Sequence, residues 1–170
     1  LVPGIEQDLC DSADRIIFMG DMNYRIRGNR PAVDKLLALN MHDVMLSNDQ
    51  LKWSMEQGLI PCGESGFIEP PLLFRPTYKY DFGTDIYDTG KSQRIPSWTD
   101  RILYHHDGME CISYNAENEL KTSDHRPVYA TFRIKVDFHE QHVVSNDAKR
   151  KASIKDSHDF TSESQVCTIS

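Results

Sequence analysis

A carboxylate and a carboxamide stand two residues apart in the segment Gly20-Asp21-Met22-Asn23. The apolar run 16–19 before them predicts a buried strand, so Asp21 and Asn23 are expected on the same side of the chain where that strand ends. A carboxylate can take a proton from water, and a carboxamide can donate a hydrogen bond to a phosphate oxygen. The pair suits hydrolysis of a phosphate ester, although these residue types also form ordinary turns through local side-chain bonds.

Two further segments supply groups that such a reaction needs. Trp98-Thr99-Asp100-Arg101 offers a carboxylate and a cation, and Ser123-Asp124-His125-Arg126 offers a histidine. His125 can donate a charged hydrogen bond near neutral pH if a carboxylate holds it. Taken alone, the first segment could be a salt-bridged strand start and the second a solvated loop. Their occurrence together with Asp21 and Asn23 indicates one phosphate site.

Hydrophobic periodicity and capping signals predict the elements that position these residues. We expect strands at 15–20, 101–105, 111–114 and 127–136, with the middle two joined as a hairpin across Asp107-Gly108. One helix is expected to start at Asn29-Arg30-Pro31.

A second helix is expected from Ser47, whose spacing to Gln50 matches a capping box, to Gly58. Residues 60–76 are rich in proline and are expected to be an extended loop, and 77–95 to be irregular. The side chains of this loop that we expect to be buried are Phe67, Leu72, Leu73 and Phe74.

Length and composition restrict the class of protein. The 170 residues suffice for one domain with a core, and the net charge of −7 argues against general nucleic-acid binding, which requires a basic face. No apolar stretch is long enough to span a bilayer. The chain starts with neither a methionine nor a secretory signal, so we expect it to be a fragment. Cysteine spacing fits no zinc site, and we expect reduced thiols of an intracellular protein at Cys10, Cys62 and Cys111.

Four blocks of the chain resemble, in order and spacing, the signature blocks of the inositol polyphosphate 5-phosphatases: 20–25, 76–81, 96–103 and 123–128. The resemblance implies an α/β fold, half of a four-layer two-sheet sandwich of the endonuclease/exonuclease/phosphatase type, over residues 1–138. It also implies a magnesium-dependent phosphatase that removes the 5-phosphate of phosphatidylinositol 4,5-bisphosphate and 3,4,5-trisphosphate. The family's main metal-binding glutamate and a further active-site histidine precede the first block. We therefore expect half a site, and an isolated chain without activity.

The resemblance also assigns roles to single residues. Asp21 and Asn23 suit activation of water and a hydrogen bond to a non-bridging oxygen, and Asp100 is implied to hold the ring of His125. Asp124 is implied to lie beside the metal or to orient the site.

The neighbouring 4-phosphate is implied to contact Tyr78, Lys79 and Arg94. Many relatives carry a lysine two positions before that arginine, where this chain has Ser92, so we expect the adjacent Lys91 to reach the inositol ring.

Residues 139–170 are polar and are expected to form a disordered tail. The tail ends in a C-a-a-X sequence that predicts farnesylation of Cys167, as in the lipid-directed, prenylated members of the family. Lys149-Arg150-Lys151 and Lys155 would add attraction to anionic lipid. We expect a lipid-anchored protein on the cytoplasmic face of membranes, at the Golgi or the primary cilium. The alternatives are a nuclease of the same superfamily and a prenylated, non-catalytic interaction module.

Overall fold

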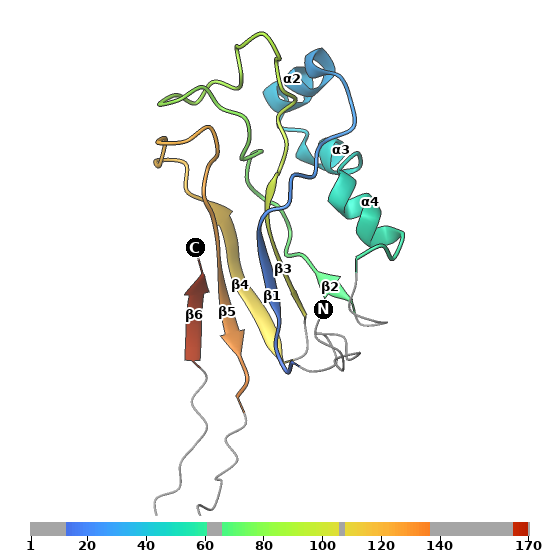
Figure 1. Ribbon diagram of the computed structural model, residues 1–170, viewed down its shortest axis with the longest axis vertical. Helices are drawn as coiled ribbons and strands as arrows, with labels where there is room; N and C mark the ends of the chain where they lie inside the picture. Colours follow the sequence, from blue (N-terminus) through green and yellow to red (C-terminus); the bar gives the residue numbers. More distant parts are fainter. Residues whose placement is uncertain (1–12, 61–65, 106–107, 137–164, 170) are drawn as a thin grey trace, which may run out of the picture.

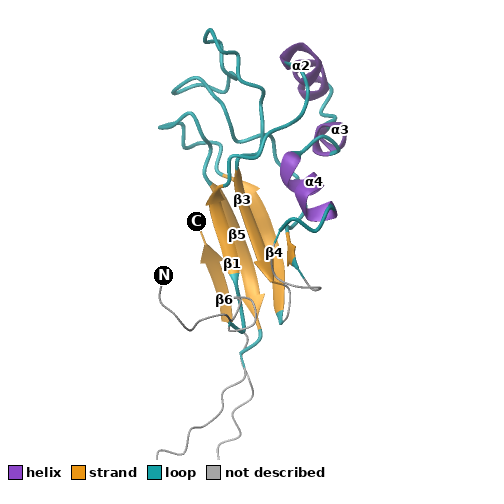
Figure 2. Cartoon of the chain, turned by 45° about the vertical axis from the view of Figure 1, so that its right-hand side comes forward, coloured by secondary structure: helices purple, strands orange, loops and turns teal. Residues whose placement is uncertain are grey.

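The computed structural model describes residues 13–60, 66–105, 108–136 and, for the backbone, 165–169. Within these ranges the chain forms two antiparallel sheets with helices and long loops gathered at one end of the strands (Figures 1 and 2). The first sheet has the order β1-β3-β2, from Ile17–Asp21, Asp100–His105 and Phe67–Ile68. The second has the order β4-β5-β6, from Met109–Ala116, Val128–Ile134 and Gln165–Ile169. No helix in the described ranges has the length and apolar character to cross a membrane.

The predicted hairpin between residues 101–105 and 111–114 is wrong. β3 pairs with β1 and β2, whereas β4 pairs with β5 in the other sheet. The apolar side chains explain the difference, because the two sheets bury a common core, in which the rings of Tyr104 and Phe132 meet at 4.9 Å. An Asp-Gly signal reports only a local turn, whereas burial of both faces places the two strands in different sheets.

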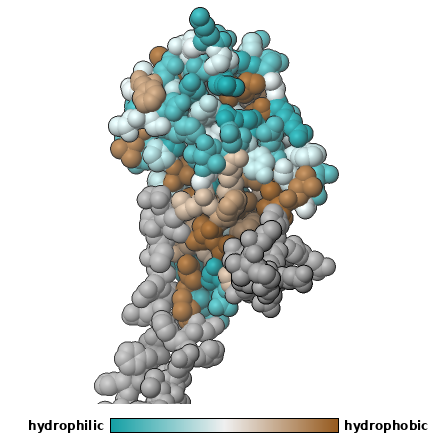
Figure 3. Space-filling model, viewed as in Figure 1, coloured by the Kyte–Doolittle hydropathy of each residue, from teal (hydrophilic) through white to brown (hydrophobic). Residues whose placement is uncertain are grey.

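The strand before Asp21 is present but is not buried as the sequence predicted. In β1, Phe18 is 53% exposed and Met19 is 36% exposed. On the face shown in Figure 3, hydrophobic residues gather over the strands, while the loop end above them is largely hydrophilic. The described residues therefore do not cover the apolar side chains Phe18 and Met19 of β1.

The helices lie beside the loop end of the first sheet (Figure 1). α2, Arg30–Ala38, is capped by Asn29, whose side chain accepts a bond from the amide of Ala32, as its sequence predicted. The second predicted helix is present as α4, Gln50–Glu56, but it starts after Ser47, and the preceding helix α3, His42–Leu46, was not predicted. Ser47 ends α3, and Asp49 caps α4 by accepting a bond from the amide of Lys52 at 2.9 Å.

The loop and the tail differ from expectation in part. Leu72 and Phe74 are buried, but Leu73 is 85% exposed, and Phe67 is half-buried in the short β2. Residues 165–169 of the tail form β6 along β5, so the expected disorder does not hold for them. The rest of the tail, with its basic residues, lies outside the described residues. Cys111 is a free thiol, while Cys10 and Cys62 also fall outside these ranges.

Candidate active site

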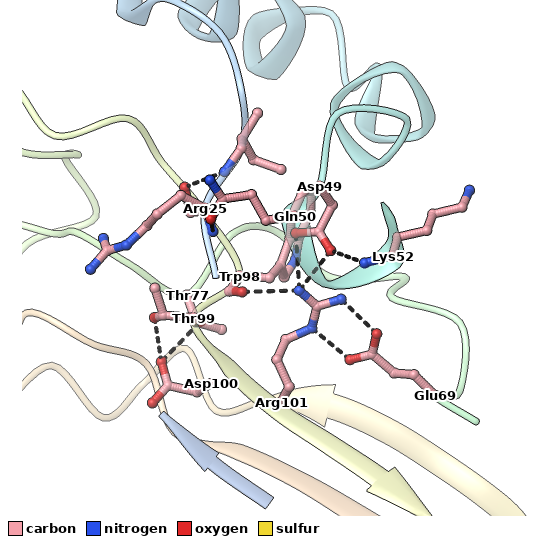
Figure 4. Close-up of polar contacts among 12 residues, drawn as sticks. Arg25, Asp49, Gln50, Lys52, Glu69, Thr77, Trp98, Thr99, Asp100 and Arg101 are labelled. Atoms are coloured by element: carbon pink, nitrogen blue, oxygen red, sulfur yellow. Dashed lines mark hydrogen bonds and ion pairs between the residues drawn. The ribbon is translucent and has the colours of Figure 1, made fainter. Parts of the chain in front are cut away.

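The predicted pairing of Asp100 with His125 is present at the loop end of the sheets. Oδ2 of Asp100, the first residue of β3, lies 2.8 Å from Nδ1 of His125, which precedes β5. Thr77 holds the two together, because its carbonyl oxygen accepts a bond from the amide of Arg126 at 2.9 Å and its hydroxyl donates to Asp100 at 3.4 Å. Asp100 also accepts a bond from the hydroxyl of Thr99 at 2.8 Å (Figure 4). With Nδ1 engaged, the Nε2 nitrogen is the one left to face a ligand.

These contacts change the ionisation of both partners. The hydrogen bond to Asp100 raises the pKa of His125 above its ordinary value, against the opposing effect of partial burial. The charges of Asp124 and Asp21 act in the same direction as Asp100. Burial opposes ionisation of Asp100, but bonds from His125 and Thr99 hold its pKa below the ordinary value. The pair therefore favours a carboxylate beside a protonated imidazole.

Asp21 and Asn23 lie at the same end of the first sheet. Asp21 is the last residue of β1 and is the register partner of Asp100 in β3. The Oδ1 atom of Asp21 accepts a bond from the amide of Asn23 at 2.9 Å, and Asn23 takes a left-handed conformation with φ of 59°. Arg25 donates to the side-chain oxygen of Asn23, so the –NH2 group of that carboxamide is left to donate to a ligand.

An arginine-rich cavity of about 640 Å³ opens next to this group. Tyr78 connects the two, because its ring lies 4.5 Å from the ring of His125 and 4.3 Å from the guanidinium of Arg25. No carboxylate is among the described residues that line the cavity, and its charged side chains are all arginines, so it suits a multiply charged anion. The lining residues are Asn23, Arg25, Ile26, Arg30, Tyr78, Ser92, Gln93, Arg94, Ile95 and Ser97.

The structure joins the predicted site residues only in part. Asn23, Tyr78 and Arg94 share the cavity, whereas Asp21 lines a smaller, mainly apolar cavity with Phe18 and Met19. The expectation of one cleft for Asp21, Asn23, Asp100 and His125 is therefore met only for part of the set.

The two predicted lysines do not line the cavity. Lys79 is half-buried beside it, and its charge lowers the pKa of Asp88, after stronger effects from backbone bonds. Lys91 is exposed on the neighbouring loop.

Asp124, the predicted metal neighbour, is half-buried and accepts a bond from the hydroxyl of Ser123 at 3.4 Å. Within the described ranges, no cluster of three or more acidic, histidine or cysteine side chains could hold a metal ion. The described residues therefore do not make a metal site on their own.

Two arginines of the cavity were not predicted as site residues. Arg25 ends the first signature block, so its place in the motif was an available signal. Arg30 carried only a helix-start signal, because the carbonyl oxygens that it bonds lie 57, 58 and 64 residues further along the chain.

Comparison with known proteins places these residues among relatives. The family model described as Endonuclease/Exonuclease/phosphatase family 2 matches residues 4–131. The chain is 45% identical over 135 residues to the human phosphatidylinositol polyphosphate 5-phosphatase type IV, covering 76% of this chain and 20% of that protein. It is 45% identical over 129 residues to the Saccharomyces cerevisiae polyphosphatidylinositol phosphatase INP53, covering 74% of this chain and 11% of that protein. The chain thus spans a small part of the length of these relatives.

Solved structures give two kinds of neighbour. The inositol polyphosphate 5-phosphatase domain of a synaptojanin, in complex with inositol (1,4)-bisphosphate and calcium ion, matches with a TM-score of 0.64 and 42% identity. That match covers 69% of this chain and 33% of the other. A Cimex nitrophorin, solved as a ferrous NO complex, matches with a TM-score of 0.67 and 37% identity over 77% of this chain and 45% of the other.

Proposed function

The chain belongs to endonuclease/exonuclease/phosphatase family 2, among the inositol polyphosphate 5-phosphatases. From this premise we propose that it contributes catalytic residues to a phosphoinositide 5-phosphatase. The proposed reaction removes the 5-phosphate of phosphatidylinositol 4,5-bisphosphate and 3,4,5-trisphosphate. The observation that carries the proposal is the Asp100–His125 pair at 2.8 Å, joined through Tyr78 to an arginine-lined cavity.

In the proposed reaction each side chain has one task. Asp21 accepts a proton from the attacking water, and the –NH2 group of Asn23 donates to a non-bridging phosphoryl oxygen. His125 donates a charged hydrogen bond from Nε2 to the phosphoryl group, and Asp100 keeps its ring protonated and oriented. Arg25 fixes the Asn23 carboxamide so that its donor, rather than its acceptor, faces the phosphate.

The phosphate next to the scissile one is assigned to the cavity. Arg94 and Tyr78 line it, and a guanidinium together with a phenol can bind the oxygens of a 4-phosphate. Lys79 and Lys91 lie outside the lining and would contribute positive potential rather than a direct bond.

We propose that most ligands of the required metal ion come from outside the described residues. Phosphatases of this family are metal-dependent, and the synaptojanin domain was solved with a calcium ion. Asp124 could add a carboxylate ligand to a magnesium ion, but the described residues form no complete set of ligands. Magnesium bound there would neutralise phosphoryl charge, as hard cations do. We therefore expect the isolated chain to be inactive.

A non-catalytic role is the second candidate, and the nitrophorin match favours it. A protein solved as a ferrous NO complex shares this architecture at 37% identity, so membership of the fold does not by itself establish hydrolysis. The catalytic proposal depends on Asp21, Asn23, Asp100 and His125 acting together.

Phosphate release from phosphatidylinositol 4,5-bisphosphate with magnesium tests the catalytic proposal. The assay compares the 170-residue chain with a fusion of this chain to the region that precedes the match in the human type IV relative. We expect turnover only in the fusion, with a loss of roughly two to four decades in His125→Ala or Asn23→Ala. Glu119→Ala, which removes an exposed loop carboxyl, is the control. A fusion without turnover, or a fully active His125→Ala, refutes the proposal, and plasmid nicking would favour a nuclease.

We also propose, on the sequence alone, that Cys167 carries a farnesyl group and that basic tail residues hold the protein at anionic membranes of the Golgi or the primary cilium.

A further inference from the structure

Arg30 is a cation at the N-terminus of a helix, an electrostatically unfavourable position. It is the first residue of α2, and the helix macrodipole disfavours positive charge at that end. No acidic residue lies in the first turn of this helix to oppose it. The side chain is only 17% exposed, so the charge is also partly removed from water.

The contacts of Arg30 explain its position. Nε donates to the Asp34 carboxylate, one turn along the helix, at 2.7 Å. The other two nitrogens reach the loop after Tyr87, on the far side of the cavity wall. Nη1 donates to the carbonyl oxygens of Asp88 at 3.0 Å and Arg94 at 2.9 Å, and Nη2 to that of Tyr87 at 3.2 Å.

The same loop is also closed from inside by Asp88. The buried carboxylate accepts bonds from the amide of Gly90 at 2.9 Å, the hydroxyl of Ser92 at 3.2 Å and the amide of Arg94 at 2.7 Å. The backbone of Arg94 is therefore held on both sides, its N–H by Asp88 and its C=O by Arg30.

Unlike its backbone, the side chain of Arg94 is not held by other described residues. It is exposed and lines the 640 Å³ cavity, and no bond to another described side chain is seen for its guanidinium. A cation without a competing partner, on a backbone fixed at both peptide groups, can bind an anion with only its own side chain left to order.

We infer that Arg30 is a positioning residue that clamps the loop 87–94 and thereby places the Arg94 guanidinium in the cavity. The functional consequence rests on the proposed 5-phosphatase activity, in which Arg94 binds the 4-phosphate. The planar fork of arginine is required, because one lysine ammonium cannot reach three carbonyl oxygens and the Asp34 carboxylate together.

Amide hydrogen exchange tests the clamp without any assay of activity. In the fusion protein, Arg30→Ala is expected to raise exchange at Gly90 and Arg94 by roughly tenfold or more, because the loop opens locally. Arg30→Lys is expected to restore only part of the protection. Lys35→Ala removes an exposed cation from the same helix and is expected to change nothing. Unchanged exchange in folded Arg30→Ala and Arg30→Lys would overturn the inference.

Kinetics test the link to the 4-phosphate. Arg30→Ala is expected to raise KM for phosphatidylinositol 4,5-bisphosphate roughly tenfold with kcat nearly unchanged, and to leave the 3,5-bisphosphate, which has no 4-phosphate, unaffected. In the Arg94→Ala background, Arg30→Ala is expected to have no further effect, because both act through one guanidinium. Additive losses would assign Arg30 another role. A parent protein without phosphatase activity would refute the proposed function, while the exchange experiment would still decide the clamp.

Discussion

At the scale of single residues, the protonation of His125 depends on one carboxylate. We predict that Asp100→Asn lowers the pKa of His125 toward its ordinary value of about 6.5, because the main stabilising bond of the imidazolium is lost. An NMR titration of the imidazole signals measures this directly in the chain. Asp124→Asn, which removes only a nearby charge, is expected to lower the pKa less. Equal shifts in the two variants would show that Asp100 has no special hold on the ring.

The same pair gives stability a pH dependence with a defined sign. The raised pKa of His125 contributes stability that is present below about pH 6.5 and is lost as the pH rises through the folded-state pKa. The lowered pKa of Asp100 contributes stability above about pH 3.9 that is lost as the pH falls through the folded-state value. Urea unfolding of Asp100→Asn is therefore expected to show its largest loss near pH 5, about midway in this window.

The signature blocks marked residues whose side chains carry the chemistry, but the sequence missed residues that act through the backbone of other segments. The family resemblance implied that Asp100 and His125 pair, and they do. Arg30 could not be assigned, because its partners are carbonyl oxygens, which every residue type carries. Nothing in a side-chain pattern marks such a bond.

At the scale of elements, Arg101 ties β3 to α4 and to the segment before Leu72. Its guanidinium bonds both oxygens of Asp49 at 3.0 Å and both oxygens of Glu69 at 2.6 Å, and Arg101 and Asp49 are almost fully buried (Figure 4). Burial opposes the charge of Arg101, but the carboxylates of Glu69 and Asp49 raise its pKa. Burial raises the pKa of Glu69 even though Arg101 opposes the shift. The network therefore depends on all three members.

We predict that Arg101→Met destabilises the fold by about 3–5 kcal/mol, because two carboxylates are left buried without a cation. Arg133→Met is the control, since Arg133 and Glu110 form an exposed pair at 2.6 Å, and it is expected to cost about 0–1 kcal/mol. Urea unfolding followed by circular dichroism measures both. Similar losses in the two variants would contradict a structural role for the buried network.

This network also explains why one helix start was misplaced. Ser47 and Gln50 match a capping box, but Asp49 caps α4 and bonds Arg101 as well. Asp49 is therefore engaged by a residue 52 positions away, which no local capping signal marks. The hairpin prediction was wrong for a similar reason. The contacts that the faces of β3 make with the rest of the molecule, and not the turn after it, determine which sheet β3 joins.

At the scale of the whole molecule, β1 is an apolar strand without a cover. It lies at the edge of its sheet in the described part of the chain, and Phe18 and Met19 face a cavity of about 240 Å³ lined also by Leu51 and Leu103. The chain spans 20% of the length of the human type IV relative. We therefore expect the fusion protein to be more stable than the chain alone, because added structure can bury this surface.

The last strand joins the fold to the proposed lipid anchor. Cys167, in β6, is the register partner of Phe132 in β5, so the first three residues of the C-a-a-X sequence are part of a sheet. Pairing with β5 fixes the backbone of β6 along the sheet, so release of this strand would give a lipid at Cys167 more reach toward a membrane. Membrane anchoring and the pairing of β6 are therefore expected to compete.

Two substitutions measure this competition in cells that express a tagged form of the chain. Val166→Pro leaves the C-a-a-X sequence intact but disturbs the pairing of Val166 with Arg133, because proline lacks the amide hydrogen of a ladder bond. We predict that it raises the membrane-bound fraction, whereas Cys167→Ser abolishes membrane binding because no thiol remains to carry the lipid. The double variant is expected to behave as Cys167→Ser alone. Membrane binding that persists in Cys167→Ser would show that the C-terminal sequence is not a lipidation signal, and an unchanged fraction in Val166→Pro would show that β6 does not restrain it.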